Sequence, residues 1–61
     1  MIVCEKLNGS KIVINADLIE MIEETPDVII TLQNGKKIMV KNSIHDIIEK
    51  AIAYKREVYS S

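Results

Sequence analysis

Two short runs of apolar, largely β-branched residues flank Asn8-Gly9 near the start of the chain, and this pattern predicts a β-hairpin over residues 1–14. A three-residue loop of Leu7, Asn8 and Gly9 places apolar side chains opposite one another. It predicts the cross-strand pairs Ile2 with Ile14, Val3 with Val13, Cys4 with Ile12, and Glu5 with Lys11. A two-residue loop would instead set Glu5 opposite Ile12, so the three-residue register is favoured, because a one-residue slip exchanges the faces of a strand.

The same turn returns 26 residues later at Asn34-Gly35, again between apolar runs. A loop of Gln33, Asn34 and Gly35 predicts a second hairpin. Its expected pairs are Val28 with Val40, Ile29 with Met39, Ile30 with Ile38, and Thr31 with Lys37. In both hairpins the glycine is expected in the left-handed conformation of a type I turn closed by a glycine bulge.

The segment between the hairpins is ambiguous. Asn15 and Asp17 suit a turn or a single helical turn, and residues 18–23 could form a strand or a helix. A helix over residues 16–24 would be ended by the proline of Thr25-Pro26-Asp27, which itself fits a turn. We favour a short strand that leads through this turn into Val28.

The C-terminal segment is expected to form one α-helix, from about Ile44 to Tyr59 and about 24 Å long. Its inward stripe has helical spacing and is apolar except for Lys55; it consists of Ile44, Ile47, Ile48, Ala51, Ile52, Lys55 and Val58. Ser43, followed three residues later by Asp46, fits an N-cap. The helix is expected to cover the apolar sheet face made by Ile2, Cys4, Ile12, Ile14, Val28, Ile30, Ile38 and Val40.

These elements predict an α+β fold in a single domain of residues 1–61, with a β-sheet region over 1–42 and a helix over 43–59. The expected architecture is a small antiparallel sheet of four or five short strands with the helix packed on one face. The opposite face would carry four apolar residues, which we interpret as a candidate self-association face: Val3, Val13, Ile29 and Met39. Because so short a chain buries only about 60% of its unfolded surface, we expect a homo-oligomer.

The composition indicates the cellular compartment in which the protein is expected. The one cysteine cannot form an intramolecular disulfide, and no Cys/His spacing suggests structural zinc. No apolar run approaches the roughly 20 residues of a membrane helix, and the first residues do not resemble a signal peptide. We therefore expect a cytoplasmic protein with no membrane insertion and no cofactor.

Two residues are candidates for catalysis, and both have a simpler interpretation. His45 falls in the first helical turn, where an exposed polar residue is expected, and Cys4 falls on the inward sheet face as a small buried hydrophobe. The sequence contains no Gly-rich phosphate loop, paired carboxylates or catalytic triad. We predict that the protein is not an enzyme.

The charged residues are segregated along the chain, although the formal net charge is only -1. The acidic block consists of Glu20, Glu23, Glu24 and Asp27. It could be a solvated edge, a docking site for a basic partner or a metal site. The metal site is least favoured, because Glu20 and Glu23 would point to opposite faces of a strand. A lysine cluster of Lys36, Lys37 and Lys41 could contact RNA, but no aromatic residue lies on a predicted strand to stack on a base.

The ordered set of motifs resembles the small bacterial FlbD-type flagellar proteins, and the likeness spans nearly the whole chain. The residues that carry it are Leu7-Asn8-Gly9, Asn15 with Asp17 and Ile19, Ile22-Glu23, Pro26-Asp27 leading into Ile30-Thr31-Leu32, Asn34-Gly35-Lys36-Lys37, and Tyr54-Lys55 with Tyr59. The resemblance implies a non-enzymatic accessory of flagellar and swarming motility.

Two functions remain open under this resemblance. The first is an interaction module that supports the torque of the flagellar motor, with a stator or basal-body protein as partner at the cytoplasmic face of the motor. The alternative is a small regulator that binds the messenger RNA of flagellar genes through Lys36, Lys37 and Lys41. The family provides no catalytic or ligand residues to transfer.

Overall fold

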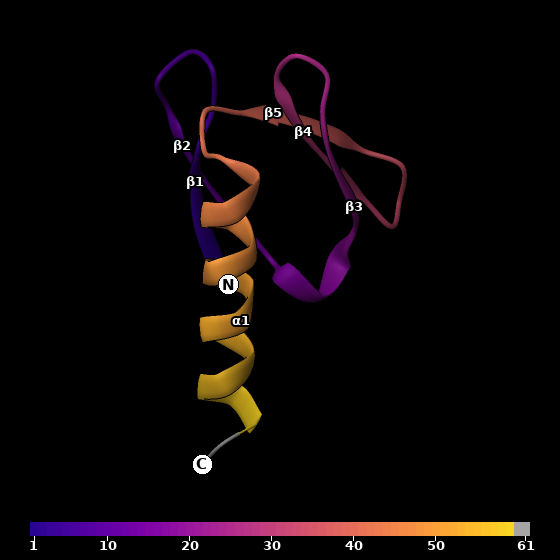
Figure 1. The fold of residues 1–61 in the computed structure, drawn as a ribbon. Helices are drawn as coiled ribbons and strands as arrows, with labels where there is room; N and C mark the ends of the chain where they lie inside the picture. The colour runs from indigo at the N-terminus through magenta and orange to yellow at the C-terminus, as the bar shows by residue number, and fades with distance from the viewer. Residues whose placement is uncertain (60–61) are drawn as a thin grey trace.

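Five antiparallel strands, one short 3-10 helix and one α-helix make up the fold of this computed structural model, which describes residues 1–59 (Figure 1). The elements in chain order are β1 Ile2–Glu5, β2 Lys11–Ile14, the short 3-10 helix η1 Ala16–Leu18, β3 Ile19–Glu24, β4 Val28–Leu32, β5 Lys37–Val40 and α1 Ile44–Tyr59. The α+β class and the bounds of the C-terminal helix are confirmed.

Both hairpins have the predicted registers, pair by pair. The turn glycines have positive φ, 91° at Gly9 and 89° at Gly35. In each loop the asparagine side chain accepts a hydrogen bond from the backbone two residues on, at 3.0 Å from Ser10 N to Asn8 and 2.9 Å from Lys36 N to Asn34. The repeated Asn-Gly sequence therefore encodes the same turn twice.

The ambiguous segment forms both of the structures considered for it, one after the other. Asn15 caps η1, because its side chain accepts a hydrogen bond of 3.0 Å from the backbone of Asp17. The chain then becomes extended at Ile19 and pairs with β4, so the strand is confirmed and the longer helix is not formed. Residues 25–27 join the two strands.

The strands form two hydrogen-bonded sheets, one of β1 and β2 and one in the order β3-β4-β5. The sheets meet where the end of β1 passes the end of β5. An isolated antiparallel bridge joins Lys6 to Val40, and Lys41 N donates to Glu5 O at 2.7 Å. The antiparallel sheet structure is thus divided into a two-stranded and a three-stranded part.

Asn42 ties this junction to the start of the helix. Its Oδ1 accepts a hydrogen bond of 2.8 Å from Glu5 N, and its Nδ2 donates to Asp46 Oδ2 at 2.7 Å. The predicted N-cap is also present, because Asp46 N donates to Ser43 Oγ at 3.1 Å. One asparagine therefore connects the first strand, the last strand and α1.

The core is aliphatic and lies where the helix and the two sheets meet. Its buried residues are Ile2, Cys4, Ile14, Ala16, Val28, Ile30, Ile38, Val40 and Ile47. All the residues expected on the covered sheet face are buried there except Ile12, which is half-buried at the edge.

The helix covers less of this core than its apolar stripe suggests. It packs against β1 and β3, and its C-terminal part extends past the strands (Figure 1). Ile47 is completely buried, whereas Ile48, Ile52 and Val58 are exposed. The stripe is wider and longer than the surface that the short strands offer.

Replacing Gly35 by alanine is expected to destabilise the fold by about 1 to 2 kcal/mol, because L-residues are strained at positive φ. A Cβ at this position would meet no atom within 4 Å, so the loss would report backbone strain alone. Urea denaturation measures it. Gly35→Asn should lose less, since asparagine tolerates the left-handed region; equal losses in the two variants would contradict this explanation.

Candidate functional site

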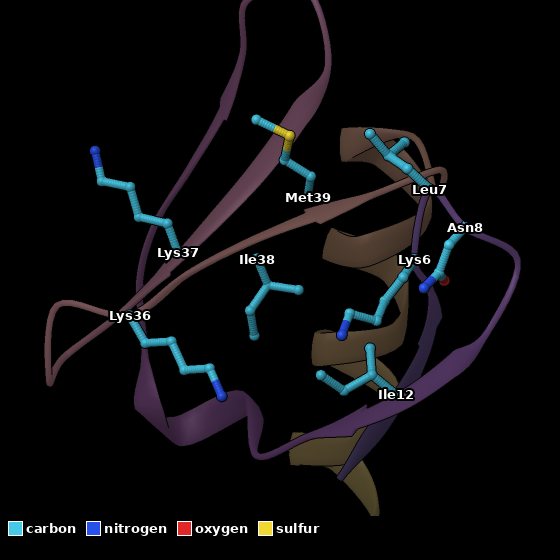
Figure 2. Close-up of a pocket in the computed structure, with 8 residues that line it drawn as sticks. All are labelled: Lys6, Leu7, Asn8, Ile12, Lys36, Lys37, Ile38 and Met39. Atoms are coloured by element: carbon cyan, nitrogen blue, oxygen red, sulfur yellow. The ribbon is translucent and has the colours of Figure 1, made fainter.

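A hollow of about 330 Å³ lies between the two sheets, where the loop of the first hairpin approaches β5 (Figure 2). Its lining residues come from both hairpins and are Lys6, Leu7, Asn8, Ile12, Lys36, Lys37, Ile38 and Met39. The floor is apolar and the rim carries three lysines. None of the lining residues in the described part of the chain is acidic.

Two of the lysines extend over the hollow from opposite sides. Figure 2 shows Lys6, from the first hairpin, and Lys36, from the β4–β5 turn, directed toward the gap that also holds Ile12 and Ile38. The turns fix their backbones, because Lys6 N donates to Ser10 O at 2.8 Å and Lys36 O accepts from Leu32 N at 2.8 Å. Two positive charges above an apolar floor suit an anionic group attached to an apolar one.

The structure brings together only part of the predicted lysine cluster. Lys36 and Lys37 line the hollow, although the side chain of Lys37 points away from it (Figure 2), and Lys41 is not among the lining residues. Lys6 was missed by the sequence analysis. Its place depends on the bridge to Val40, a contact between distant residues that no local pattern reveals.

The acidic block lies along an exposed edge. Glu20, Glu23 and Glu24 are on β3, the outermost strand of its sheet, and Asp27 follows in the turn; all four are exposed. Glu23 and Glu24 are consecutive strand residues and project from opposite faces. Within residues 1–59 no group of three His, Cys, Asp or Glu side chains is placed to hold a metal ion.

The candidate self-association residues fall into two pairs on different sheets. Val3 pairs with Val13 in the two-stranded sheet, and Ile29 pairs with Met39 in the three-stranded one. Ile29 is half-buried and the other three are exposed. Their role in association stays a prediction.

The two candidates for catalysis differ in their exposure to solvent. His45 is exposed in the first turn of α1. Cys4 is buried in the core, and desolvation raises the pKa of its thiol; Lys50 opposes this shift and Asp46 adds to it. A buried thiol that resists ionisation is a poor nucleophile.

The buried thiol of Cys4 should make stability fall at high pH. Below the ordinary thiol pKa of about 8.5 the group is protonated in both states, so its burial costs nothing extra. Above that value the unfolded chain loses a proton that the folded chain keeps, and the free energy of unfolding decreases with rising pH. Urea denaturation of the protein and of Cys4→Ala at several pH values tests this; a difference between them that does not change with pH would contradict it.

Comparison with known proteins gives one informative match. Searches of the curated proteins and of the solved structures find nothing similar to the chain. Among the described residues, no helix combines the length and the apolar character needed to cross a membrane. Residues 1–59 match the family described as flagellar and swarming motility proteins, FlbD. Because the match covers all but the last two residues, the chain belongs to the FlbD family of flagellar and swarming motility proteins.

Proposed function

We propose that this protein is a non-enzymatic interaction module that supports the torque of the flagellar motor by binding a motor, stator or basal-body protein at its cytoplasmic face. The hollow between the hairpins is the observation that carries this proposal, together with the family. It offers an apolar floor of Ile12 and Ile38 below Lys6 and Lys36. A partner segment with an acidic residue beside an apolar one complements this arrangement.

The negatively charged acidic block provides a second docking surface. The acidic block of Glu20, Glu23, Glu24 and Asp27 lies on an edge strand, where it is open to a basic partner segment. A protein with surfaces of both signs can bring two components together, and electrostatic complementarity chiefly increases the rate and specificity of such encounters.

Messenger RNA is the second candidate partner, because Lys36 and Lys37 share the hollow with a third lysine. Among the described residues, none that lines the hollow has an aromatic side chain on which a base could stack. Tyr54, on α1, is half-buried against the core. The protein partner is therefore favoured over RNA.

The test is a reversible cross-linking pull-down of the tagged protein from motile cells, scored in parallel for motor proteins and for RNA. The double variant Lys6→Glu/Lys36→Glu reverses the charge of the hollow. Lys11→Glu/Lys55→Glu makes the same charge change at exposed lysines outside it. Glu20→Lys/Glu24→Lys reverses charge in the acidic block.

We expect the parent and the Lys11/Lys55 control to retain a motor or basal-body protein in the eluate. The Lys6/Lys36 variant should lose this protein from the eluate, and cells that carry the variant should no longer swarm. Loss only from the Glu20/Glu24 variant would move the binding site to the acidic block. Specific transcripts without motor proteins, retained less at high salt and lost when the lysines are replaced, would overturn the protein-binding function in favour of RNA regulation.

A further inference from the structure

The outer face of the three-stranded sheet carries a compact patch with a regular arrangement of charge. It contains two cross-strand rows, Glu23–Ile29–Met39 and Met21–Thr31–Lys37, and we call these six residues the outer patch. The core side of the same strands holds Ile22, Ile30 and Ile38. Lys37 and Met39 are also among the residues that line the hollow, but Figure 2 shows both side chains directed away from Ile38, which places them on the outer side.

The outer patch has a largely buried centre, Ile29 and Thr31 on β4, between two half-exposed methionines. Met21 and Met39 are 46% and 49% exposed, Ile29 is half-buried, and Thr31 is only 7% exposed. Thr31 Oγ1 makes no hydrogen bond with any described residue. Flexible methionines around a dry centre are typical of a surface that binds another protein surface.

The two charges of the patch occupy opposite corners. Glu23 lies on β3 in the first row and Lys37 on β5 in the second, so the remaining corners are Met21 and Met39. Neither Glu23 nor Lys37 forms an ion pair with another residue whose side chain is described. The patch therefore presents one carboxylate and one ammonium group that no described side chain neutralises.

We propose that a second copy of this chain packs against the outer patch, related to the first by a two-fold axis that runs close to the Met21–Met39 diagonal. This axis sets Glu23 of each copy opposite Lys37 of the other, and the two methionines lie near the axis on either side of the central Ile29 and Thr31. Such an interface is isologous, which is the commonest form of homodimer. The strands of the two facing sheets cross at nearly a right angle, one of the two usual sheet packings.

The geometry selects this axis among the possible ones. Adjacent strands are about 4.8 Å apart and alternate residues about 6.8 Å apart along a strand, so the patch corners form a rectangle of about 9.6 by 6.8 Å. A two-fold axis through its centre at about 45° to the strands, about 10° from the Met21–Met39 diagonal, brings each corner to within about 2 Å of its counterpart. A two-fold axis parallel to the strands would place Glu23 against Met39 of the other copy. An axis perpendicular to the strands, in the plane of the interface, would place Glu23 against Met21. Only the diagonal axis joins opposite charges in both contacts.

The outer patch revises the predicted self-association face. It keeps Ile29 and Met39 and replaces the other pair, Val3 and Val13, which belongs to the other sheet. Six residues form an interface smaller than the standard size, so the dimer is expected to be reversible and to depend on concentration. This proposal does not depend on the proposed function, since it concerns the isolated protein.

The experiment is sedimentation equilibrium of the purified full chain over a wide concentration range. Glu23→Lys and Lys37→Glu should each raise the dimer dissociation constant at least about tenfold, because each creates two like-charge contacts. Mixing these two variants should restore dimerisation as a heterodimer, since every contact then pairs opposite charges. Glu23→Lys/Lys37→Glu in one chain should also recover the parent behaviour.

Two matched controls keep the result specific. Glu24→Lys makes the same charge change on the neighbouring residue of β3, whose side chain projects from the other face, and should leave association unchanged. Met39→Lys should weaken association, whereas Val13→Lys, on the other sheet, should not. Circular dichroism establishes that each variant is folded.

Three outcomes would overturn the proposal. The parent could remain a monomer at every concentration. Association could survive Glu23→Lys and Met39→Lys but fail with Val13→Lys, which would place the interface on the first sheet. Finally, the mixture of the two single variants could fail to dimerise, and this would exclude the diagonal two-fold axis.

Discussion

Ile47→Ala is expected to remove about 2 to 5 kcal/mol of stability, the range for truncating a large aliphatic side chain in a packed core. Ile47 is completely buried and is the deepest contact of α1 with the sheets. A single core in so small a domain rarely supplies more than about 3 to 5 kcal/mol, so this variant should be largely unfolded at room temperature. Circular dichroism during urea denaturation measures the loss.

The next residue provides a matched control. Ile48→Ala removes the same atoms as Ile47→Ala and lies in the same helical turn, but the side chain of Ile48 is 44% exposed. Ile48→Ala should cost less than about 1 kcal/mol, because surface truncations leave no cavity and alanine favours the helix. If the two variants had equal stability, the helix would not be anchored through Ile47.

Asn42→Ala is expected to cost about 1 to 3 kcal/mol, because it removes two hydrogen bonds that join separate parts of the fold. The Asn42 side chain bonds Glu5 N at 2.8 Å and Asp46 Oδ2 at 2.7 Å, and the residue is half-buried. Its loss leaves the end of β1 without this link to the start of α1. Amide hydrogen exchange should therefore accelerate at Glu5 as well as in the first turn of the helix.

Asn8→Ala is the control for this prediction. Asn8 also makes two side-chain hydrogen bonds, but both go to Ser10 within one exposed turn, at 3.0 Å and 2.7 Å. Its replacement should cost about 1 kcal/mol or less and leave the exchange at Glu5 unchanged. An Asn42→Ala protein with the stability of Asn8→Ala would show that the link between β1 and α1 is not important for the fold.

The sequence by itself determined the local elements of this protein. Asn8-Gly9 and Asn34-Gly35 set both hairpin registers, because a loop of defined length fixes which residues face each other and a slip would expose the apolar side chains. Ser43 and the helical spacing that follows set the helix from Ile44 to Tyr59. These signals lie within a few residues of the structures they specify.

The tertiary structure alone decided how these elements meet. The division into two sheets, the Asn42 link and the placing of Lys6 opposite Lys36 all depend on contacts between residues more than thirty positions apart in the chain. The same packing decided which apolar residues of α1 are buried, because Ile47 and Ile48 are equivalent in the sequence pattern and differ only in what lies beside them. Hydrophobic periodicity records that a residue can be buried, but the surface that buries it is made by distant parts of the chain.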